Sequence, residues 1–369
     1  MYNDYMSSDQ KIKLVIIIDS FARGGAENVV RVLIPEFLKS FQEVHLILIQ
    51  NTEVEYPLLD LENLGLKIHR LNAKKIAQIS VFFNYLKLIH RIKPGVVHAH
   101  LFWSQILSAI SRITFLKIKI FWIEHDTSLS RTHFHWFVYR CLSVTTSRVL
   151  AVSLDVKNFL TINKIDNIEV VHNPIRDVFT LRRDFNSKPK FLFVGRLVEQ
   201  KNPMLLIKSF SYAIDNQMIP DNSSLVICGE GKLENSLKIL VTSLKLDKSV
   251  SFLKFIEPDR LVTIYQESCI LISTSLHEGF GLTRLEALAT GSAVITTRTA
   301  GITGIIETNS LVDLKNIGIF IVNDDIKSIA IAMENSLQPK IWELNVIIQR
   351  SELISRFSPK FIASEYLKL

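Results

Sequence analysis

Cysteine is scarce in this sequence, with three residues, Cys141, Cys228 and Cys269, among 369. They lie far apart and form no C-x-x-C pair, which excludes a disulfide framework and a cysteine-rich metal site. We interpret them as reduced thiols in the core. No segment reaches the roughly 18 uncharged apolar residues of a membrane-spanning helix, and the first apolar run is too short for a signal peptide. The sequence therefore predicts a cytoplasmic protein.

Acidic residues are absent from one long stretch. Between Asn63 and Ile123 there is no Asp or Glu, although the net charge of the whole chain is only +7. Such an asymmetry is typical of a surface that meets an anionic partner, and a solvated basic face is the alternative. The basic residues of this stretch are Lys67, Arg70, Lys74, Lys75, Lys87, Arg91, Lys93, Arg112, Lys117 and Lys119.

The two common phosphate-binding signatures are missing as well. The sequence holds neither the dinucleotide pattern G-x-G-x-x-G nor the phosphate loop G-x-x-x-x-G-K-[ST]. A nucleotide, if bound, is therefore held by some other arrangement.

Short runs rich in β-branched residues alternate with segments of helical periodicity. This alternation predicts an α/β fold with parallel sheets covered by helices on both faces. The expected strands are 13–18, 43–49, 66–71, 95–100, 117–123, 148–153 and 167–172, then 190–195, 225–229, 249–255, 269–275 and 292–297.

The alternation stops between residues 171 and 190, where Pro174 and Pro189 bracket a polar stretch without periodicity. We interpret this stretch as a linker between two similar α/β domains, as the length of the chain also favours. In such folds ligands bind beyond the carboxyl ends of the strands, so the turns that follow strands are the places to search.

Two turns of the first half carry unusual residues. Gly24 and Gly25 precede a helix expected from about Ala26, whose N-terminus could hold a phosphate, although many such turns need glycine for their backbone alone. The strand 117–123 is followed by Glu124, His125 and Asp126. A histidine at a strand end beside two acids makes His125 a candidate functional residue.

Histidines also end a neighbouring strand. His98 and His100 lie in VVHAH and could line the same site as His125. A lone histidine is more often structural, so this assignment rests on the position at strand ends.

Three turns of the second half contain candidate ligand-binding residues. VGRLVEQKNP places Arg196 and Lys201 just after a strand, where two cations could hold a diphosphate; an ion pair with Glu199 is the alternative. CGEGKLENSL supplies Gly229 in another strand-to-helix turn, which could also be a plain tight turn.

The third turn, in STSLHEGFGLTRLEALATGSAVITT, places Glu278 before a short helix and Glu286 about one turn inside it. Between the two acids lie Gly279, Phe280, Gly281, Leu282 and Thr283, whose amides could face an anion. Helix capping would explain Glu286 but not the glycines. Carboxylates that accept from sugar hydroxyls on either side of a phosphate explain both, so the pattern indicates a sugar nucleotide.

Taken in order, GGAENVV, VGRLVEQKNP, CGEGKLENSL, EGFGLTRLEALA and the terminal FSPKFIASEYLKL resemble the family-4 glycosyltransferases of the GT-B fold. The resemblance implies two Rossmann-like domains facing each other across a cleft. It implies an acceptor-side domain at 1–180, a donor domain at 187–357 and a C-terminal helix at 358–369 that crosses back to the first domain.

The resemblance also implies roles for single residues. Arg196 and Lys201 would stabilise the leaving diphosphate, Glu286 would bind the ribose, and Glu278 would face the donor sugar. His125 would contact the transferred sugar. Gly24 and Gly25 would lie near the phosphates and the acceptor, and Gly229 and residues 279–283 would contribute to nucleotide binding. Transfer would retain the anomeric configuration and need no metal or cofactor, since the nucleotide sugar is itself the substrate.

The basic segment 73–94 suggests where the acceptor is found. Ile76, Ile79, Phe82, Phe83, Leu86 and Ile89 lie near helical spacing among Lys74, Lys75, Lys87, Arg91 and Lys93. We expect this helix to meet an anionic membrane, which would place the enzyme on the inner face of the cytoplasmic membrane beside a lipid-linked saccharide acceptor. The rival interpretation is an amphipathic helix packed on its own sheet.

Two other functions stay open at this point. A sugar-nucleotide epimerase of the same fold would keep the nucleotide site but need no acceptor face. A nucleic-acid-binding protein would explain the basic segment but not EGFG and EALA, and no recognition motif is present. We therefore expect no nucleic acid among the partners.

Overall fold

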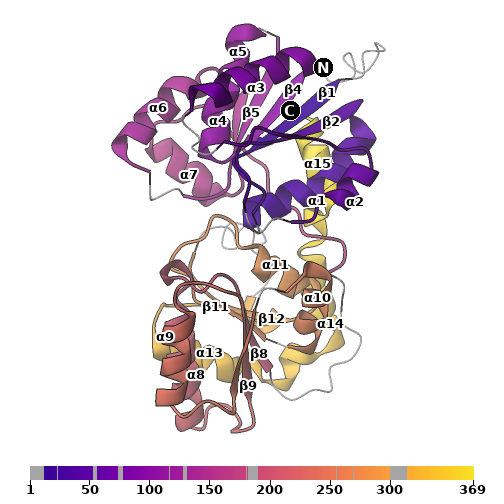
Figure 1. Cartoon of the computed structure of the whole chain (residues 1–369). Helices are drawn as coiled ribbons and strands as arrows, with labels where there is room; N and C mark the ends of the chain where they lie inside the picture. Colours follow the sequence, from indigo (N-terminus) through magenta and orange to yellow (C-terminus); the bar gives the residue numbers. More distant parts are fainter. Residues whose placement is uncertain are drawn as a thin grey trace. The chain divides into compact units, whose positions relative to one another are not determined.

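The computed structural model describes residues 12–22, 24–52, 56–73, 78–115, 117–127, 131–179, 181, 190–254, 256–268, 270–299 and 314–369. The chain divides into two compact units (Figure 1). Unit 1 is Met1–Pro174 with Pro359–Leu369, and unit 2 is Ile175–Ser358.

Unit 1 is built on a parallel sheet with the strand order β3-β2-β1-β4-β5-β6-β7. Its strands are β1 (Lys13–Ile18), β2 (Glu43–Leu48), β3 (Lys67–Arg70), β4 (Val96–His100), β5 (Lys119–Glu124), β6 (Arg148–Ala151) and β7 (Ile168–Val170). Its helices are α1 (Gly25–Ser40), α2 (Leu59–Asn63), α3 (Ile79–Ile92), α4 (Phe102–Ala109), α5 (Ser111–Thr114), α6 (His133–Ser143), α7 (Leu154–Ile162) and α15 (Pro359–Leu367).

The end of the chain completes unit 1, because α15 packs beside α1 (Figure 1). The Tyr366 ring meets the rings of Phe37 and His98, with centroids 5.8 and 5.2 Å apart. All three side chains are buried. The final helix is therefore part of the core of this unit, although most of its neighbours lie over 250 residues earlier in the sequence.

Unit 2 repeats the architecture with the strand order β10-β9-β8-β11-β12-β13, again all parallel. The strands are β8 (Lys190–Val194), β9 (Ser224–Cys228), β10 (Val250–Leu253), β11 (Ile270–Ser273), β12 (Ala293–Thr297) and β13 (Ile319–Val322). The α-helices are α8 (Pro203–Asp215), α9 (Glu234–Ser243), α10 (Pro258–Glu267), α11 (Leu282–Ala289), α13 (Ile326–Ser336) and α14 (Leu344–Glu352). The 3₁₀ turns are η1 (Glu199–Lys201), η2 (Leu314–Ile317), η3 (Pro339–Trp342) and η4 (Ser355–Phe357).

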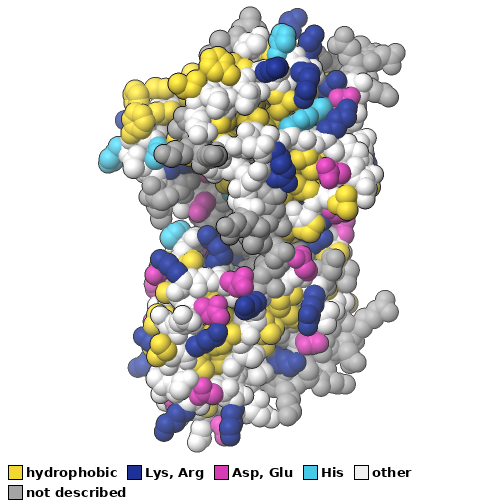
Figure 2. Space-filling view, in the orientation of Figure 1, with side chains coloured by type: hydrophobic (Ala, Val, Ile, Leu, Met, Phe, Trp, Pro, Cys, Tyr) yellow, Lys and Arg dark blue, Asp and Glu magenta, His cyan; other side chains and the backbone are white. Residues whose placement is uncertain are grey.

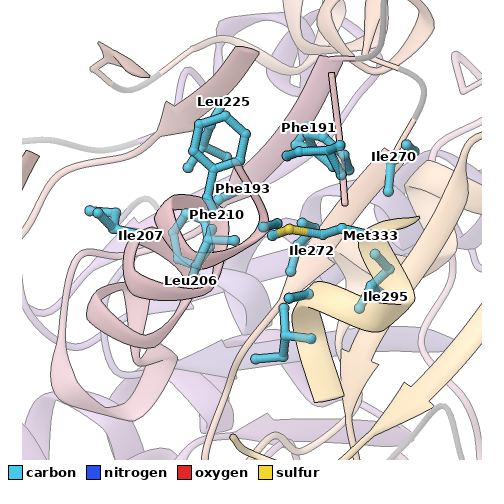
Figure 3. Packing of buried hydrophobic residues seen from close by; sticks show 14 of the residues in the cluster. Phe191, Phe193, Leu206, Ile207, Phe210, Leu225, Ile270, Ile272, Ile295 and Met333 are labelled. Atoms are coloured by element: carbon cyan, nitrogen blue, oxygen red, sulfur yellow. The ribbon is translucent and has the colours of Figure 1, made fainter. Parts of the chain in front are cut away.

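The core of unit 2 joins its sheet to the helices that cover one face. Phe191 and Phe193 of β8 meet Phe210 of α8, and Met333 of α13 packs with Ile272 and Ile295 of the neighbouring strands (Figure 3). The two Phe rings at 191 and 210 are edge to face with centroids 5.9 Å apart. This packing fixes the carboxyl end of β8, from which the first turn of the candidate site departs.

Both strand orders share one topological feature. Successive connections run outward in opposite directions from a central pair, β1 with β4 in unit 1 and β8 with β11 in unit 2. The loops at the carboxyl ends of such a pair diverge to opposite faces and leave a crevice, where α/β proteins bind ligands. The fold therefore singles out the loops after these four strands.

The predicted α/β fold with two Rossmann-like domains is confirmed, and each predicted strand that lies in the described residues is found within a few residues of its expected bounds. β13 was not predicted from the sequence. The interpretation of the cysteines was wrong for Cys141, which is exposed on α6, while Cys228 is buried. Cys269 lies outside the described residues. Among the helices that the structure describes, none is long and apolar enough to cross a membrane.

Candidate functional site

The loops after β8 and β11, the central pair of unit 2, are tied together by side chains. Lys201 forms an ion pair with Oε1 of Glu278, and the Ser275 hydroxyl donates to the same oxygen over 2.7 Å. The Thr274 hydroxyl donates to the carbonyl of Lys201 over 3.0 Å. Lys201, expected at the diphosphate, and Glu278, expected to face the donor sugar, are thus in contact although they lie 77 positions apart in sequence.

Arg196 lies on the same turn and is exposed. Its Nη2 donates to Oε1 of Gln200 over 3.3 Å, and Gln200 in turn donates to the carbonyl of His277 over 3.1 Å. The alternative considered for these cations, an ion pair with Glu199, does not form, since Glu199 pairs with Lys232 over 2.7 Å. The guanidinium of Arg196 is therefore held at the crevice by a neutral partner.

Glu278 is ionised in this setting. Burial raises the pKa of its carboxyl, but the charges of Lys201 and Arg284 and the hydrogen bonds from Lys201 and Ser275 together hold the pKa below its ordinary value. A buried carboxylate that already has a cationic partner can accept hydroxyl hydrogen bonds, but it is a poor nucleophile.

The glycines of this region serve the backbone. Gly229 has φ +145°, and a Cβ there would overlap the carbonyl oxygen of Gly195. Gly281 has φ +80° and caps the N-terminus of α11, where a Cβ would overlap the guanidinium of Arg284. Both positions therefore require glycine for close packing as well as for φ.

Glu286 lies inside α11, as predicted, and is only 7% exposed. It accepts a hydrogen bond from the Tyr265 hydroxyl over 3.0 Å. Burial raises the pKa of its carboxyl to about 7, and the Tyr265 bond and the charge of Arg176 oppose this only in part. Tyr265 was not foreseen, because a tyrosine on an amphipathic helix carries no motif.

In unit 1, the strand ends bring His100 and His125 together. Nδ1 of His100 lies 2.9 Å from Nε2 of His125, and the rings stack with centroids 5.2 Å apart. Burial lowers the pKa of His125 to about 4 and that of His100 well below its usual value. Both rings are therefore neutral near pH 7 and share one N–H···N hydrogen bond.

The other candidates at these strand ends are structural. Glu124 pairs with Arg131 over 2.8 Å, and that guanidinium lies 4.8–5.1 Å from the ring centroids of Phe102, Trp136 and Tyr139. His98 packs in the core against Phe37, Phe121 and Tyr366. The expectation that His98 lines the same site as His125 was wrong, because its ring faces α1 and α15.

The first turn of α1 contains an acidic residue, Glu27. The carboxylate of Glu27 is buried against Gly24, so that a Cβ at this glycine would overlap it. Gly25, by contrast, has open space around it.

A half-buried carboxylate that the sequence did not indicate lies at the central pair of unit 1. Asp19 follows β1 and accepts from the backbone and hydroxyl of Ser104 over 2.7 and 2.6 Å. It thereby caps the start of α4, just after Leu101, which has φ +70°. Burial raises the pKa of Asp19, and these hydrogen bonds partly offset the effect.

Two family models cover nearly all of the chain. The model described as Glycosyltransferase Family 4 matches residues 23–178, and the one described as Glycosyl transferases group 1 matches residues 180–349. The chain belongs to the family-4 glycosyltransferases. The two matches divide within the segment that the sequence indicated as a linker.

Three relatives match this chain at 28–32% identity. One is the N-acetylgalactosamine-N,N'-diacetylbacillosaminyl-diphospho-undecaprenol 4-alpha-N-acetylgalactosaminyltransferase of Campylobacter jejuni, 28% identical over 77% of this chain and 80% of that protein. Another is the UDP-Gal:alpha-D-GlcNAc-diphosphoundecaprenol alpha-1,3-galactosyltransferase of Escherichia coli, 32% identical over 46% of this chain and 41% of that protein. An uncharacterized glycosyltransferase of Methanocaldococcus jannaschii is 30% identical, and the match spans 39% of it.

Solved structures agree on the fold. HepE of Anabaena in complex with UDP-glucose has a TM-score of 0.80 and 15% identity, covering 97% of this chain and 98% of that one. A glycosyltransferase from Rickettsia africae has a TM-score of 0.75 and 20% identity, covering 97% of each. These neighbours establish this family-4 member as a GT-B protein.

Proposed function

We propose that this protein transfers a hexosyl or N-acetylhexosaminyl unit from a nucleotide sugar to a saccharide acceptor, which we expect to be linked to a lipid diphosphate, in glycan or surface-polysaccharide assembly. The observation that carries the proposal is the contact of Lys201 and Glu278 at the central strand pair of unit 2, with Arg196 on the same turn. The lipid-diphosphate acceptor is inferred from the relatives in Escherichia coli and Campylobacter jejuni, whose names specify such substrates.

Each candidate residue of unit 2 has a role in this reaction. Arg196 and Lys201 neutralise the charge that develops on the diphosphate as the glycosidic bond breaks. These cations neutralise the charge of the leaving diphosphate, as a metal ion does in other transferases, so we expect no metal requirement. Glu286 accepts from the ribose hydroxyls, and the amides of residues 279–283 face the phosphates.

Glu278 orients the donor sugar rather than attacking it. A covalent intermediate would need a carboxylate free to approach the anomeric carbon, whereas Glu278 is held by Lys201 and Ser275. We infer that the configuration is retained through attack on the face that the diphosphate leaves, with a diphosphate oxygen taking the proton of the acceptor hydroxyl. In this scheme Lys201 stays paired with negative charge throughout.

The residues of unit 1 serve the acceptor side. His125 is neutral and is held by His100, so it acts as a hydrogen-bonding group toward the transferred sugar and not as a cation. Gly24 and Gly25 let the backbone of the following helix approach the acceptor.

We infer that unit 1 also meets an anionic membrane, through part of the apolar face that was expected on α3. The buried face of α3 is Val81, Tyr85, Leu88, Ile89 and Ile92, as in the rival interpretation of a helix packed on its sheet. Ile79 and Phe83 are instead 75% and 63% exposed. Ile76, Lys74 and Lys75 lie outside the described residues.

Two exposed aromatic residues of another helix also support this inference. Phe134 and Phe137 of α6 are 69% and 62% exposed, and Figure 2 shows hydrophobic side chains gathered over α6 and toward α3. Phe83 shares α3 with the exposed Lys87 and Arg91. Exposed aromatic residues on a basic unit fit an interface with anionic lipid, which we expect at the inner face of the cytoplasmic membrane.

The membrane contact is tested with vesicles. Wild-type protein should co-sediment with anionic but not neutral vesicles and dissociate as salt shortens the Debye length to about 3 Å at 1 M. Replacing Phe83, Phe134 and Phe137 with Ser should abolish sedimentation, whereas Ile239→Ser, at an equally exposed position of unit 2, should not. Wild-type protein that ignores anionic vesicles at low salt would contradict the membrane part alone.

The transferase itself is tested in two steps. A screen of UDP-sugars and GDP-mannose for thermal stabilisation should identify the donor. The donor is then incubated with lipid-diphosphate saccharides, and the anomeric configuration of the product is determined by NMR. Release of nucleotide without acceptor and with an epimerised sugar would contradict transfer and favour the epimerase.

A further inference from the structure

The two carboxylate oxygens of Glu286 have different surroundings, and the difference points to Tyr265. Oε2 accepts from the Tyr265 hydroxyl over 3.0 Å. Oε1 accepts no hydrogen bond from any residue that the structure describes, and it is not fully enclosed. Because most of the Glu286 side chain is shielded from water, a ligand hydroxyl that donates to Oε1 would satisfy an oxygen that the protein leaves open.

Tyr265 is held in place by its helix and by neighbouring residues. It lies in the last turn of α10, and its side chain is fully buried. Its ring meets the Phe179 ring edge to face, with centroids 5.7 Å apart. Its carbonyl accepts from the Ser292 hydroxyl over 3.1 Å, which ties the end of α10 to the turn between α11 and β12. The Tyr265 hydroxyl therefore occupies a fixed position relative to α11.

A buried tyrosine hydroxyl needs a hydrogen-bond partner for the stability of the fold alone. Phenylalanine, however, would fill the same part of the core without that need. Among the described residues, Glu286 is the one hydrogen-bond partner of the Tyr265 hydroxyl. Since Glu286 is also the carboxylate expected at the ribose, the contact favours a role of the hydroxyl in binding.

The hydroxyl also affects the ionisation of Glu286. Burial raises the pKa of this carboxyl to about 7, and the hydrogen bond from Tyr265 is the largest effect that lowers it, followed by the charge of Arg176. Tyr265 stays protonated, because burial and then the charge of Glu286 raise the pKa of its hydroxyl well above the usual value. The nearby thiol of Cys228 is neutral, since burial raises its pKa to about 12. Tyr265 is thus a constant donor near pH 7.

We propose that Tyr265 is a positioning residue of the nucleotide site, whose hydroxyl holds Oε2 of Glu286 and leaves Oε1 to accept from the ribose hydroxyls. This inference rests on the proposed function. Fixing the carboxylate before the nucleotide binds avoids the entropic cost of ordering a flexible side chain on binding. The same hydrogen bond favours the ionised carboxylate, which is a stronger acceptor than the neutral acid. Tyr265 acts through Glu286 without touching the ligand.

Tyr265→Phe removes the hydroxyl and keeps the ring. UDP and 2′,3′-dideoxy-UDP, which lacks both ribose hydroxyls, are titrated calorimetrically, or the guanosine pair if the wild type prefers GDP. We expect the preference for UDP over its dideoxy analogue to fall by about tenfold in Tyr265→Phe, while affinity for the analogue changes by less than about twofold. In a Glu286→Ala background, Tyr265→Phe should leave the preference unchanged. Tyr212→Phe, the control on α8 of the same unit, should leave it unchanged as well.

The pH dependence of UDP affinity separates positioning from packing. Affinity should increase as Glu286 ionises, so the midpoint of this increase follows the pKa of its carboxyl. Tyr265→Phe removes a hydrogen bond to the ionised form, and the midpoint should move to higher pH. Replacing Tyr265 with 3-fluorotyrosine, a stronger donor of nearly the same shape, should move the midpoint to lower pH. A purely structural role would change stability without these opposite shifts.

A folded Tyr265→Phe variant with the wild-type preference for UDP, or with an unshifted midpoint, would overturn the inference. If that variant does not fold, the 3-fluorotyrosine protein decides, and an unshifted midpoint there would overturn it equally. Wild-type protein that binds UDP and its dideoxy analogue with equal affinity would also refute it, because Glu286 would then not bind the ribose. Wild-type protein that binds neither UDP nor GDP would contradict the proposed function instead.

Discussion

Glu286→Gln should make the unliganded protein more stable and the nucleotide complex weaker. Burial raises the pKa of Glu286 to about 7 from an ordinary value of 4.5. Between these two pH values the unfolded chain releases the proton while the folded chain retains it, so folding stability falls as pH rises. The gap between the two pKa values corresponds to roughly 3 kcal/mol, lost in full above pH 7.

Glutamine mimics the protonated acid, can still accept from Tyr265 and does not titrate. The free energy of unfolding of Glu286→Gln should therefore exceed that of the wild type only slightly at pH 4.5. This difference should increase up to about pH 7 and remain constant above it. At pH 8 we expect a melting temperature roughly 5–10 °C higher for a unit of this size. Glu267→Gln is the control, since Glu267 ends the same helix as Tyr265 but is exposed.

Calorimetry supplies the second half of the test. The ribose hydroxyls would donate to an ionised carboxylate, so affinity for UDP should increase with pH between about 6 and 8 in the wild type. Glu286→Gln should bind about tenfold to a hundredfold more weakly, and without this pH dependence. An advantage in stability that does not vary with pH, or unchanged UDP affinity, would refute the assignment of Glu286.

The other predictions concern the cations, the glycines and the histidines. Arg196→Ala or Lys201→Ala should lower turnover by about a hundredfold or more, and a change in the Michaelis constant alone would mean that these residues only bind. Gly229→Ala should cost at least about 3 kcal/mol or prevent folding, because φ is +145° and the new Cβ would overlap Gly195, whereas Gly25→Ala should be nearly neutral. A lost activity in folded Gly25→Ala would then indicate contact with the acceptor. Since His125 has a pKa lowered to about 4, turnover should show no titration of this ring between pH 6 and 7, and a limb there that disappears in His125→Asn would contradict its neutral role.

Local sequence patterns predicted the elements of this protein. Five-residue runs of buried β-branched and aromatic residues are recognisable because a strand covered on both faces needs apolar side chains throughout. The position of Glu278 before a helix and of Glu286 inside it followed from glycines that interrupt and end the apolar pattern, and the structure places both acids accordingly. These features depend on neighbours within about ten residues.

Other features depended on residues far apart in the chain, and only the tertiary structure decided them. Nothing local indicates that Arg284 points beneath Gly281, that Glu124 pairs with Arg131 among aromatic rings, or that His98 faces the final helix. The apolar face expected on α3 was only partly right for a related reason. Ile79 and Phe83 are exposed as that expectation requires, but Ile89 is buried, because several registers of that apolar helix could pack on the sheet. The sequence by itself determined which residues form strands, helices and turns, since short-range sterics and burial control these. The tertiary structure decided which charges are buried together and therefore which are ionised, because desolvation and pairing depend on the surroundings in space.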